Sequence, residues 1–147
     1  MSIKTSIINF IASIQKEIVV LKNEKAEAAK QNEKNTDEIF CEILTVLDTF
    51  ERSEDIIKER ELDKDENTSK AIKRLLNAKK KLLFVLEKYN IKEIEFENNK
   101  SVEEYCIVTD TEANSTRETG DIISIEKKGF KRNDHLLRPA EVVIVKN

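Results

Sequence analysis

The fold is decided by the stretch AIKRLLNAKKKLLFVLEKYN, residues 71–90, together with the IKEIEF of residues 91–96 that follows it. Before Asn90 the apolar residues recur every three or four positions, which is the period of a helix. After Asn90 the period falls to two, which is the period of a strand. We therefore expect a helix to end at Asn90 and a β-rich segment to follow it. The helical stripe comprises Ile72, Leu75, Leu76, Lys79, Leu82, Leu83, Leu86 and Tyr89.

A longer helix is predicted upstream, from Ile3 to about Ile57. Apolar residues between Ile7 and Leu21 are spaced by alternating steps of four and three, which predicts one continuous stripe along a helix. The stripe weakens through a polar stretch between Lys22 and Asp37 and resumes out of phase at Ile39. Nothing nearby in the sequence could cover it, so its simplest partner is a second copy of the chain, in parallel or antiparallel orientation.

The predicted dimer interface combines this stripe with the helix of residues 71–90, whose wide apolar face suits a four-helix bundle with two helices from each copy. The interface residues we expect are Ile7, Ile11, Ile14, Ile18, Leu21, Ile43, Val46, Phe50, Leu75, Leu82 and Leu86.

Between the helices, residues 58–69 are charged or polar without an apolar period, which predicts a loop in which Thr68 or Ser69 caps the second helix. Three strands are expected later, at residues 105–109, 121–126 and 140–145, and the last should be covered on both faces. Residues 110–120 are expected to form a polar loop. The fold class is therefore α+β, with dimerising helices over residues 1–90 and a small β-rich head over residues 91–147.

Composition restricts the function. Charged residues make up 37% of the chain and the formal net charge is −3, so we expect a protein partner and no nucleic acid. The one basic cluster, Lys79–Lys81, is a minor alternative. Cys41, Cys106 and the single His135 lack metal-ligand or disulfide spacing, so we expect no metal, no cofactor and a reducing cytoplasmic location.

Catalytic motifs such as GxSxG, HExxH and a phosphate-binding loop do not occur in the sequence, so we expect no enzymatic activity. Residues 1–21 are too short and too charged to span a bilayer, and we expect no membrane partner. A membrane-surface helix with the same periodicity stays open as an alternative.

Four segments of the sequence carry distinctive motifs: KKGFKRNDHLLRPAEVV (127–143) near the C-terminus, ILTVLDTFER (43–52) and LLFVLEKYNI (82–91) in the predicted helices, and GDII (120–123) at a strand start. Together they resemble the C-terminal signature, the helical motifs and a strand start of the GrpE family of nucleotide exchange factors. The match in order and spacing runs from about Phe40 to the end of the chain. ENNKSVEEY (97–105) lacks the Asp-Pro pair and the His of the family pattern, so the chain is expected to be a divergent member.

The resemblance implies a homodimeric co-chaperone without catalytic chemistry. A head would enter the ATPase domain of a DnaK-type chaperone, hold its nucleotide cleft open and release ADP, while the paired helices would act as a thermal sensor. The runner-up is a coiled-coil adaptor for an unrelated protein. The contact residues implied are Gly129, Phe130, Asn133, His135, Arg138 and Ile144, where His135 replaces a family Arg.

Structural roles compete with contact at several of these positions. Gly129 is expected to be a turn residue with an unusual φ, while Phe130, Pro139 and Val142 are expected in the core. Arg138 suits either partner contact or pairing within the head, and both interpretations stay open.

Overall fold

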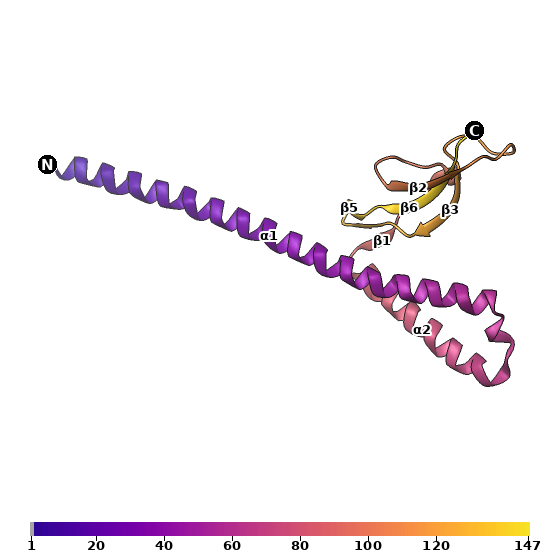
Figure 1. Cartoon of the computed structure of the whole chain (residues 1–147). Coiled ribbons are helices and arrows are strands. Elements are labelled where there is room, and N and C mark those ends of the chain that lie inside the picture. The colour runs from indigo at the N-terminus through magenta and orange to yellow at the C-terminus, as the bar shows by residue number, and fades with distance from the viewer. Residues whose placement is uncertain (1) are drawn as a thin grey trace. The chain divides into compact units, whose positions relative to one another are not determined.

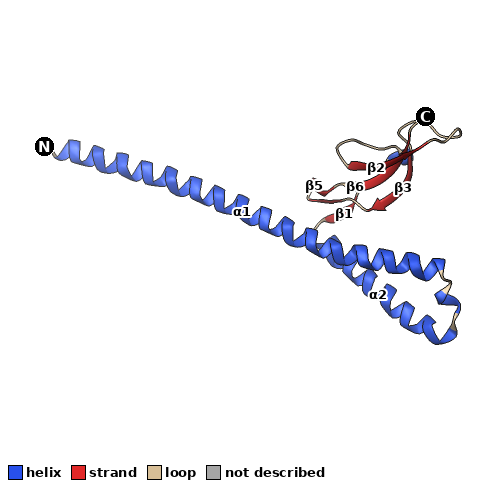
Figure 2. Cartoon of the chain, in the orientation of Figure 1, coloured by secondary structure: helices blue, strands red, loops and turns tan. Residues whose placement is uncertain are grey.

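The computed structural model describes residues 2–147 and confirms the predicted α+β fold: a long helix and a second helix precede a small all-β part (Figures 1 and 2). The chain divides into two compact units, Met1–Phe40 and Cys41–Asn147. Among the described residues, no helix combines enough length with enough apolarity to cross a lipid bilayer.

Helix α1 runs without interruption from Ile3 to Glu59, close to the predicted end at Ile57. In the first unit its apolar stripe is exposed, and Ile7 keeps 52% of its accessible surface. In the second unit the same helix turns Leu44 and Leu47 inward, where both are almost completely buried. Burial of these two leucines contributes on the order of 2 kcal/mol each to the stability of this unit.

Helix α2, Glu66–Lys88, begins earlier than the sequence predicted. The cap is Asp65, whose side chain accepts a hydrogen bond from the backbone N–H of Asn67 at 3.0 Å, so the expected cap at Thr68 or Ser69 is wrong. Aspartate is among the strongest N-cap residues, which explains the early start. Only residues 60–65 connect the helices, and they include the 3₁₀ turn η1, Leu62–Lys64.

The end of α2 agrees with the prediction. Asn90 has a φ of 58°, the left-handed conformation that commonly terminates a helix. Strand β1, Ile91–Glu93, follows at once, and Leu86 on the last turn of α2 is buried.

The head contains two three-stranded sheets, with strand orders β1-β4-β5 and β2-β6-β3. Strand β6, Ala140–Val145, lies between β2, with which it is parallel, and β3, with which it is antiparallel. Val142 and Val145 are fully buried, as expected for a strand covered on both faces. Strand β2, Cys106–Glu112, extends into the predicted polar loop, whereas β3, Ile122–Lys127, lies within one residue of its predicted bounds. The short 3₁₀ turn η2, Glu97–Asn99, lies between β1 and β2.

Strands β4, Phe130–Arg132, and β5, His135–Arg138, form a hairpin that the sequence analysis did not predict. Its two-residue turn consists of Asn133 and Asp134, with φ values of 48° and 67°. Two successive left-handed residues match the right-handed twist of paired strands, and Asn and Asp tolerate this conformation better than most residues.

Gly129 does not adopt the unusual φ that we expected. Among residues 2–147, the one glycine in the left-handed region is Gly120, with φ 93°. Gly129 is needed for a close approach instead. A Cβ at this position would lie 2.5 Å from the backbone nitrogen of Ala140 and 3.0 Å from the carbonyl carbon of Pro139. The Gly129 carbonyl also accepts a hydrogen bond from the N–H of Ile94 at 2.8 Å, so this backbone is held from two sides.

Gly129→Ala should therefore destabilise the head strongly, by about 3 kcal/mol, because the new methyl group meets backbone atoms that cannot rotate away. Gly120→Ala is the comparison, since a Cβ there meets only the Ser101 hydroxyl at 3.8 Å. It should cost about 1–2 kcal/mol of left-handed backbone strain. Urea denaturation followed by circular dichroism measures both values, and a Gly129 variant as stable as the Gly120 variant would contradict the close-approach explanation.

Candidate partner-binding site on the β-head

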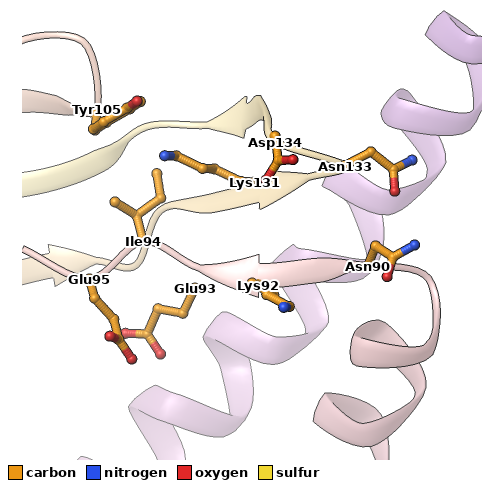
Figure 3. A pocket seen from close by; sticks show the side chains of 9 residues that line it. All are labelled: Asn90, Lys92, Glu93, Ile94, Glu95, Tyr105, Lys131, Asn133 and Asp134. Carbon is orange, nitrogen blue, oxygen red and sulfur yellow. The ribbon is translucent and has the colours of Figure 1, made fainter.

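A hollow of about 540 Å³ lies on the head beside the β4–β5 turn (Figure 3). Strand β1 and the residues after it supply one side, and Lys131 of β4 with the Asn133–Asp134 turn supplies the other. Its lining mixes both charges, two amides and one aromatic ring, which suits polar recognition of a protein surface. The lining residues are Asn90, Lys92, Glu93, Ile94, Glu95, Tyr105, Lys131, Asn133 and Asp134.

One end of the hollow is built from Tyr105 and Lys131. The Lys131 ammonium lies 3.8 Å from the centre of the Tyr105 ring, and Figure 3 shows the lysine extending toward the tyrosine. This cation–π contact orients both side chains. The Tyr105 carbonyl accepts a hydrogen bond from the N–H of Ala140 at 2.9 Å, which fixes the tyrosine to the start of the central strand.

The opposite end is the β4–β5 turn. The Asn133 N–H donates to the Asn90 carbonyl at 3.2 Å, which ties the turn to the residue that ends α2. Asn133, Asp134 and His135 are all exposed, so they present an amide, a carboxylate and an imidazole on a braced loop. Such a loop offers polar groups at little entropic cost, because its backbone is already ordered.

The contact residues implied by the family resemblance lie in different environments. Asn133 and His135 are exposed at the turn, whereas Gly129 is buried and Phe130 keeps only 2% of its surface. Strand β4 directs the Phe130 ring into the core, in agreement with the core position that we expected for this residue. Ile144 is partly buried and packs against the cluster of Ile122, Ala140 and Val142.

Arg138 pairs within the chain. Its guanidinium donates to both carboxylate oxygens of Asp48 on α1, at 2.7 and 2.5 Å, and its Nε donates to the Lys128 carbonyl at 2.9 Å. The side chain is 11% exposed. Arg138 thus joins the end of β5 to the long helix, and it acts on the site by positioning the head.

A second ionic connection runs through Lys79. Its ammonium lies 2.8 Å from Glu51 and 2.5 Å from Glu54, and Lys128 of the head reaches the same Glu51 at 3.2 Å. Lys79 is 13% exposed, so it is engaged by α1 and does not present its charge to a nucleic acid. The alternative function for the Lys79–Lys81 cluster thereby loses one of its three cations.

The residues of the predicted dimer interface differ in their exposure. Leu86 is 1% exposed and lies in the core of its own chain. Val46 and Leu75 are exposed and available, and the other interface residues of unit Cys41–Asn147 are partly buried: Ile43, Phe50 and Leu82.

Sequence reasoning missed Tyr105, Lys131 and Asp48 as site-forming residues. Asp48 stands in the ILTVLDTFER motif, where an acidic residue between apolar neighbours could have been matched to the arginine of LLRPA. Tyr105 and Lys131 gave no comparable signal, because their contact depends on how β2 and β4 approach each other in space.

The pairing of Arg138 with Asp48 can be measured by a double-mutant cycle with Arg138→Met and Asp48→Asn. Each single variant should destabilise the fold by about 1.5–3 kcal/mol, because the remaining partner loses charge-assisted hydrogen bonds. The double variant should cost clearly less than the sum, leaving a coupling of about 1–3 kcal/mol. Simple additivity in urea denaturation would show that the pair contributes nothing to holding the head.

The Lys79 cluster predicts a pH dependence. The hydrogen bond from Lys79, followed by that from Lys58, holds the pKa of Glu54 below its ordinary value of 4.5, while burial opposes the shift. For Lys79, burial lowers the pKa, but hydrogen bonds to Glu51 and Glu54 outweigh it and raise the pKa.

Because the pKa of Glu54 is lowered by folding, the stability it contributes is present above pH 4.5 and is lost as the pH falls through the folded value. Glu54→Gln should lower the melting temperature at pH 7, and this deficit should shrink below about pH 4. Glu42→Gln, at an exposed position of the same helix, is the control and should leave the pH profile unchanged. A deficit that stays constant down to pH 2 would contradict the assignment.

Comparison with known proteins agrees with the motifs and the fold. The sequence model of the GrpE family matches residues 8–146, which includes α1 from its sixth residue, all of α2 and each strand of the described residues. A similar curated protein is "Protein GrpE" of Sulfurovum sp. (strain NBC37-1), which is 33% identical over 109 residues. That alignment covers 71% of this chain and 57% of the relative, so the chain spans little more than half the length of the curated protein it matches. The extent of the family match shows that this chain belongs to the GrpE family.

Proposed function

We propose that this chain is a nucleotide exchange factor, a co-chaperone that binds the ATPase domain of a DnaK-type chaperone and promotes release of ADP. The observation that carries the proposal is the family match over residues 8–146, which includes the helical motifs as well as the β-head. The chain itself supplies no group for hydrolysis in this proposal, so the chemistry stays with the chaperone.

Exchange requires that the head bind the open form of the nucleotide cleft better than the closed form, because a ligand shifts an equilibrium only by its differential affinity. A head that wedges a cleft must resist deformation. The features that support this role are the central strand β6, the Gly129 close approach and the Arg138–Asp48 ion pair.

The proposed contact surface is the hollow together with the β4–β5 turn. Asn133 and His135, which the resemblance implies as contacts, are exposed at this turn, and Lys131 and Tyr105 extend the surface beside it. Aromatic side chains such as that of Tyr105 are enriched among the residues that carry most of the binding energy of an interface. We assign Gly129, Phe130, Arg138 and Ile144 to shaping this surface from beneath.

The working form in this proposal is a homodimer. The exposed stripe Ile7, Ile11, Ile14, Ile18 and Leu21 supports it, because a single chain would leave these side chains in water. Within the unit Cys41–Asn147, Val46 and Leu75 are exposed apolar residues that a second copy could also cover.

The test is release of fluorescent ADP from each purified DnaK-type chaperone of the source organism. The chain should accelerate release, and Asn133→Gly with Lys131→Met should reduce the acceleration about tenfold or more, since removing a contact at each end of the hollow costs on the order of 1–2 kcal/mol each. Glycine at position 133 keeps the left-handed turn while removing the amide.

Glu126→Gln, on an exposed position of β3 outside the hollow, is the matched control and should release ADP at the unmodified rate. If the unmodified chain binds these chaperones without changing ADP release, the exchange proposal is wrong. Release unaffected by the two-residue variant would instead move the contact surface elsewhere on the head.

A further inference from the structure

The first turns of α1 expose more apolar surface than a two-stranded coil can cover. In the 4-3 spacing, Ile11 and Ile18 take position a of the heptad, and Ile7, Ile14 and Leu21 take position d. These five would pack in a dimer seam. The large apolar side chains left outside the seam are Ile3, Ile8, Phe10, Val19 and Val20.

Three of the remaining residues flank the seam directly. Ile3 and Phe10 occupy position g, and Ile8 occupies position e. Phe10 is 65% exposed and Ile8 56% exposed in the single chain. Positions e and g stay at the edge of a two-stranded coil but become interior in a bundle of four helices, whose apolar faces extend beyond a and d.

The residue types of the seam also favour an assembly of more than two helices. Isoleucine at both a and d favours assemblies of more than two strands, because a β-branched side chain at d packs poorly in a parallel dimer. This pattern holds from Ile7 to Ile18 and then ends. Further along the same helix, Lys25 and Asn32 occupy position a, and a polar residue at a favours a two-stranded coil.

The charges at positions e and g also differ between the first turns of α1 and the part of the helix after Glu17. Glu17 at g and Lys22 at e of a second copy would meet in a parallel dimer, whereas an antiparallel one would bring the g residues Glu17 and Glu24 together. Before Glu17 the flanking positions are uncharged: Ile3, Ile8, Phe10 and Gln15. The flanking positions e and g therefore carry dimer-specifying charges from Glu17 onward and are uncharged before it, where position a holds one lysine, Lys4, in the first turn of the helix.

We propose that two dimers of this chain associate through Ile3–Leu21 and form a tetramer, with the four helices of this segment packed as a bundle. The proposal rests on the dimer of the proposed function. A membrane surface fits less well, because the side opposite the seam carries Thr5, Asn9 and Ser13 with one lysine, Lys16, whereas surface-binding helices are rich in Lys and Arg there.

The test is the mass of the full-length protein in solution, by sedimentation velocity and native mass spectrometry at micromolar concentrations. The unmodified protein should contain four 17.0 kDa chains per particle. The double variant Ile8→Gln, Phe10→Gln should contain two, with its helical circular dichroism retained, because the seam at a and d is unchanged. Val20→Gln, at the outward position c, is the matched control and should stay tetrameric.

An unmodified protein that stays dimeric at all concentrations overturns the tetramer, as does a double variant that remains tetrameric. Sedimentation with vesicles of neutral and of anionic phospholipid should leave the protein in solution, and its capture by either kind would assign the apolar face to a membrane. ADP release separates the two proposals: the dimeric double variant should match the unmodified protein per chain. A tetramer that never accelerates ADP release would overturn the exchange function alone.

Discussion

The ion pair between Arg138 and Asp48 is the constraint on which the second unit depends. It joins residues 90 positions apart, with both carboxylate oxygens engaged at 2.7 and 2.5 Å. A planar guanidinium that meets a carboxylate through two bonds fixes direction as well as distance. The Arg138 Nε also donates a hydrogen bond to the Lys128 carbonyl. One side chain therefore positions both β5 and the residues just before β4 against α1. The two residues belong to two of the four segments that resemble the family, 43–52 and 127–143, and their pairing provides a physical reason for the occurrence of both segments in one chain.

Asparagine occupies most of the left-handed backbone positions in and next to the head. The chain has only two glycines, yet Asn90, Asn98, Asn99 and Asn133 all have positive φ. Asparagine tolerates this region at lower cost than most residues and keeps a polar side chain that glycine lacks. At Asn90 and Asn133 the turn geometry and the polar lining of the hollow therefore come from the same residues. Replacing either by glycine preserves the turn and removes only the surface chemistry.

The helices were predictable because their signals are periodic and long. The start of α2 was misplaced because residues 58–69 look uniformly polar, and only Asp65 accepting from Asn67 distinguishes the cap. The β4–β5 hairpin was missed because each strand is short and β4 is mostly charged. Burial of Arg132 to 7% exposure is a tertiary effect that a polar sequence conceals. The candidate site was partly predictable, at Asn133 and His135, since they follow a recognisable motif. Its aromatic end depends on a contact between separate strands, which no local pattern encodes.

The two units of the chain depend on different forces, and this difference has consequences for assembly. Cys41–Asn147 has its own core, with Leu44, Leu47 and Val142 buried, so it can be stable as a single copy. Met1–Phe40 has an exposed apolar stripe and buries none of its large residues between Ile3 and Leu21. An isolated helix gains little stability from propensity alone, so its order in solution must come from association with other chains. Association follows mass action, which makes the order of this helix dependent on protein concentration while that of the head is not. The seam at Lys25, Ala28 and Asn32 lacks large apolar residues and contributes least to that association. Loss of pairing should therefore begin there and leave the head, which the Arg138–Asp48 ion pair holds, folded.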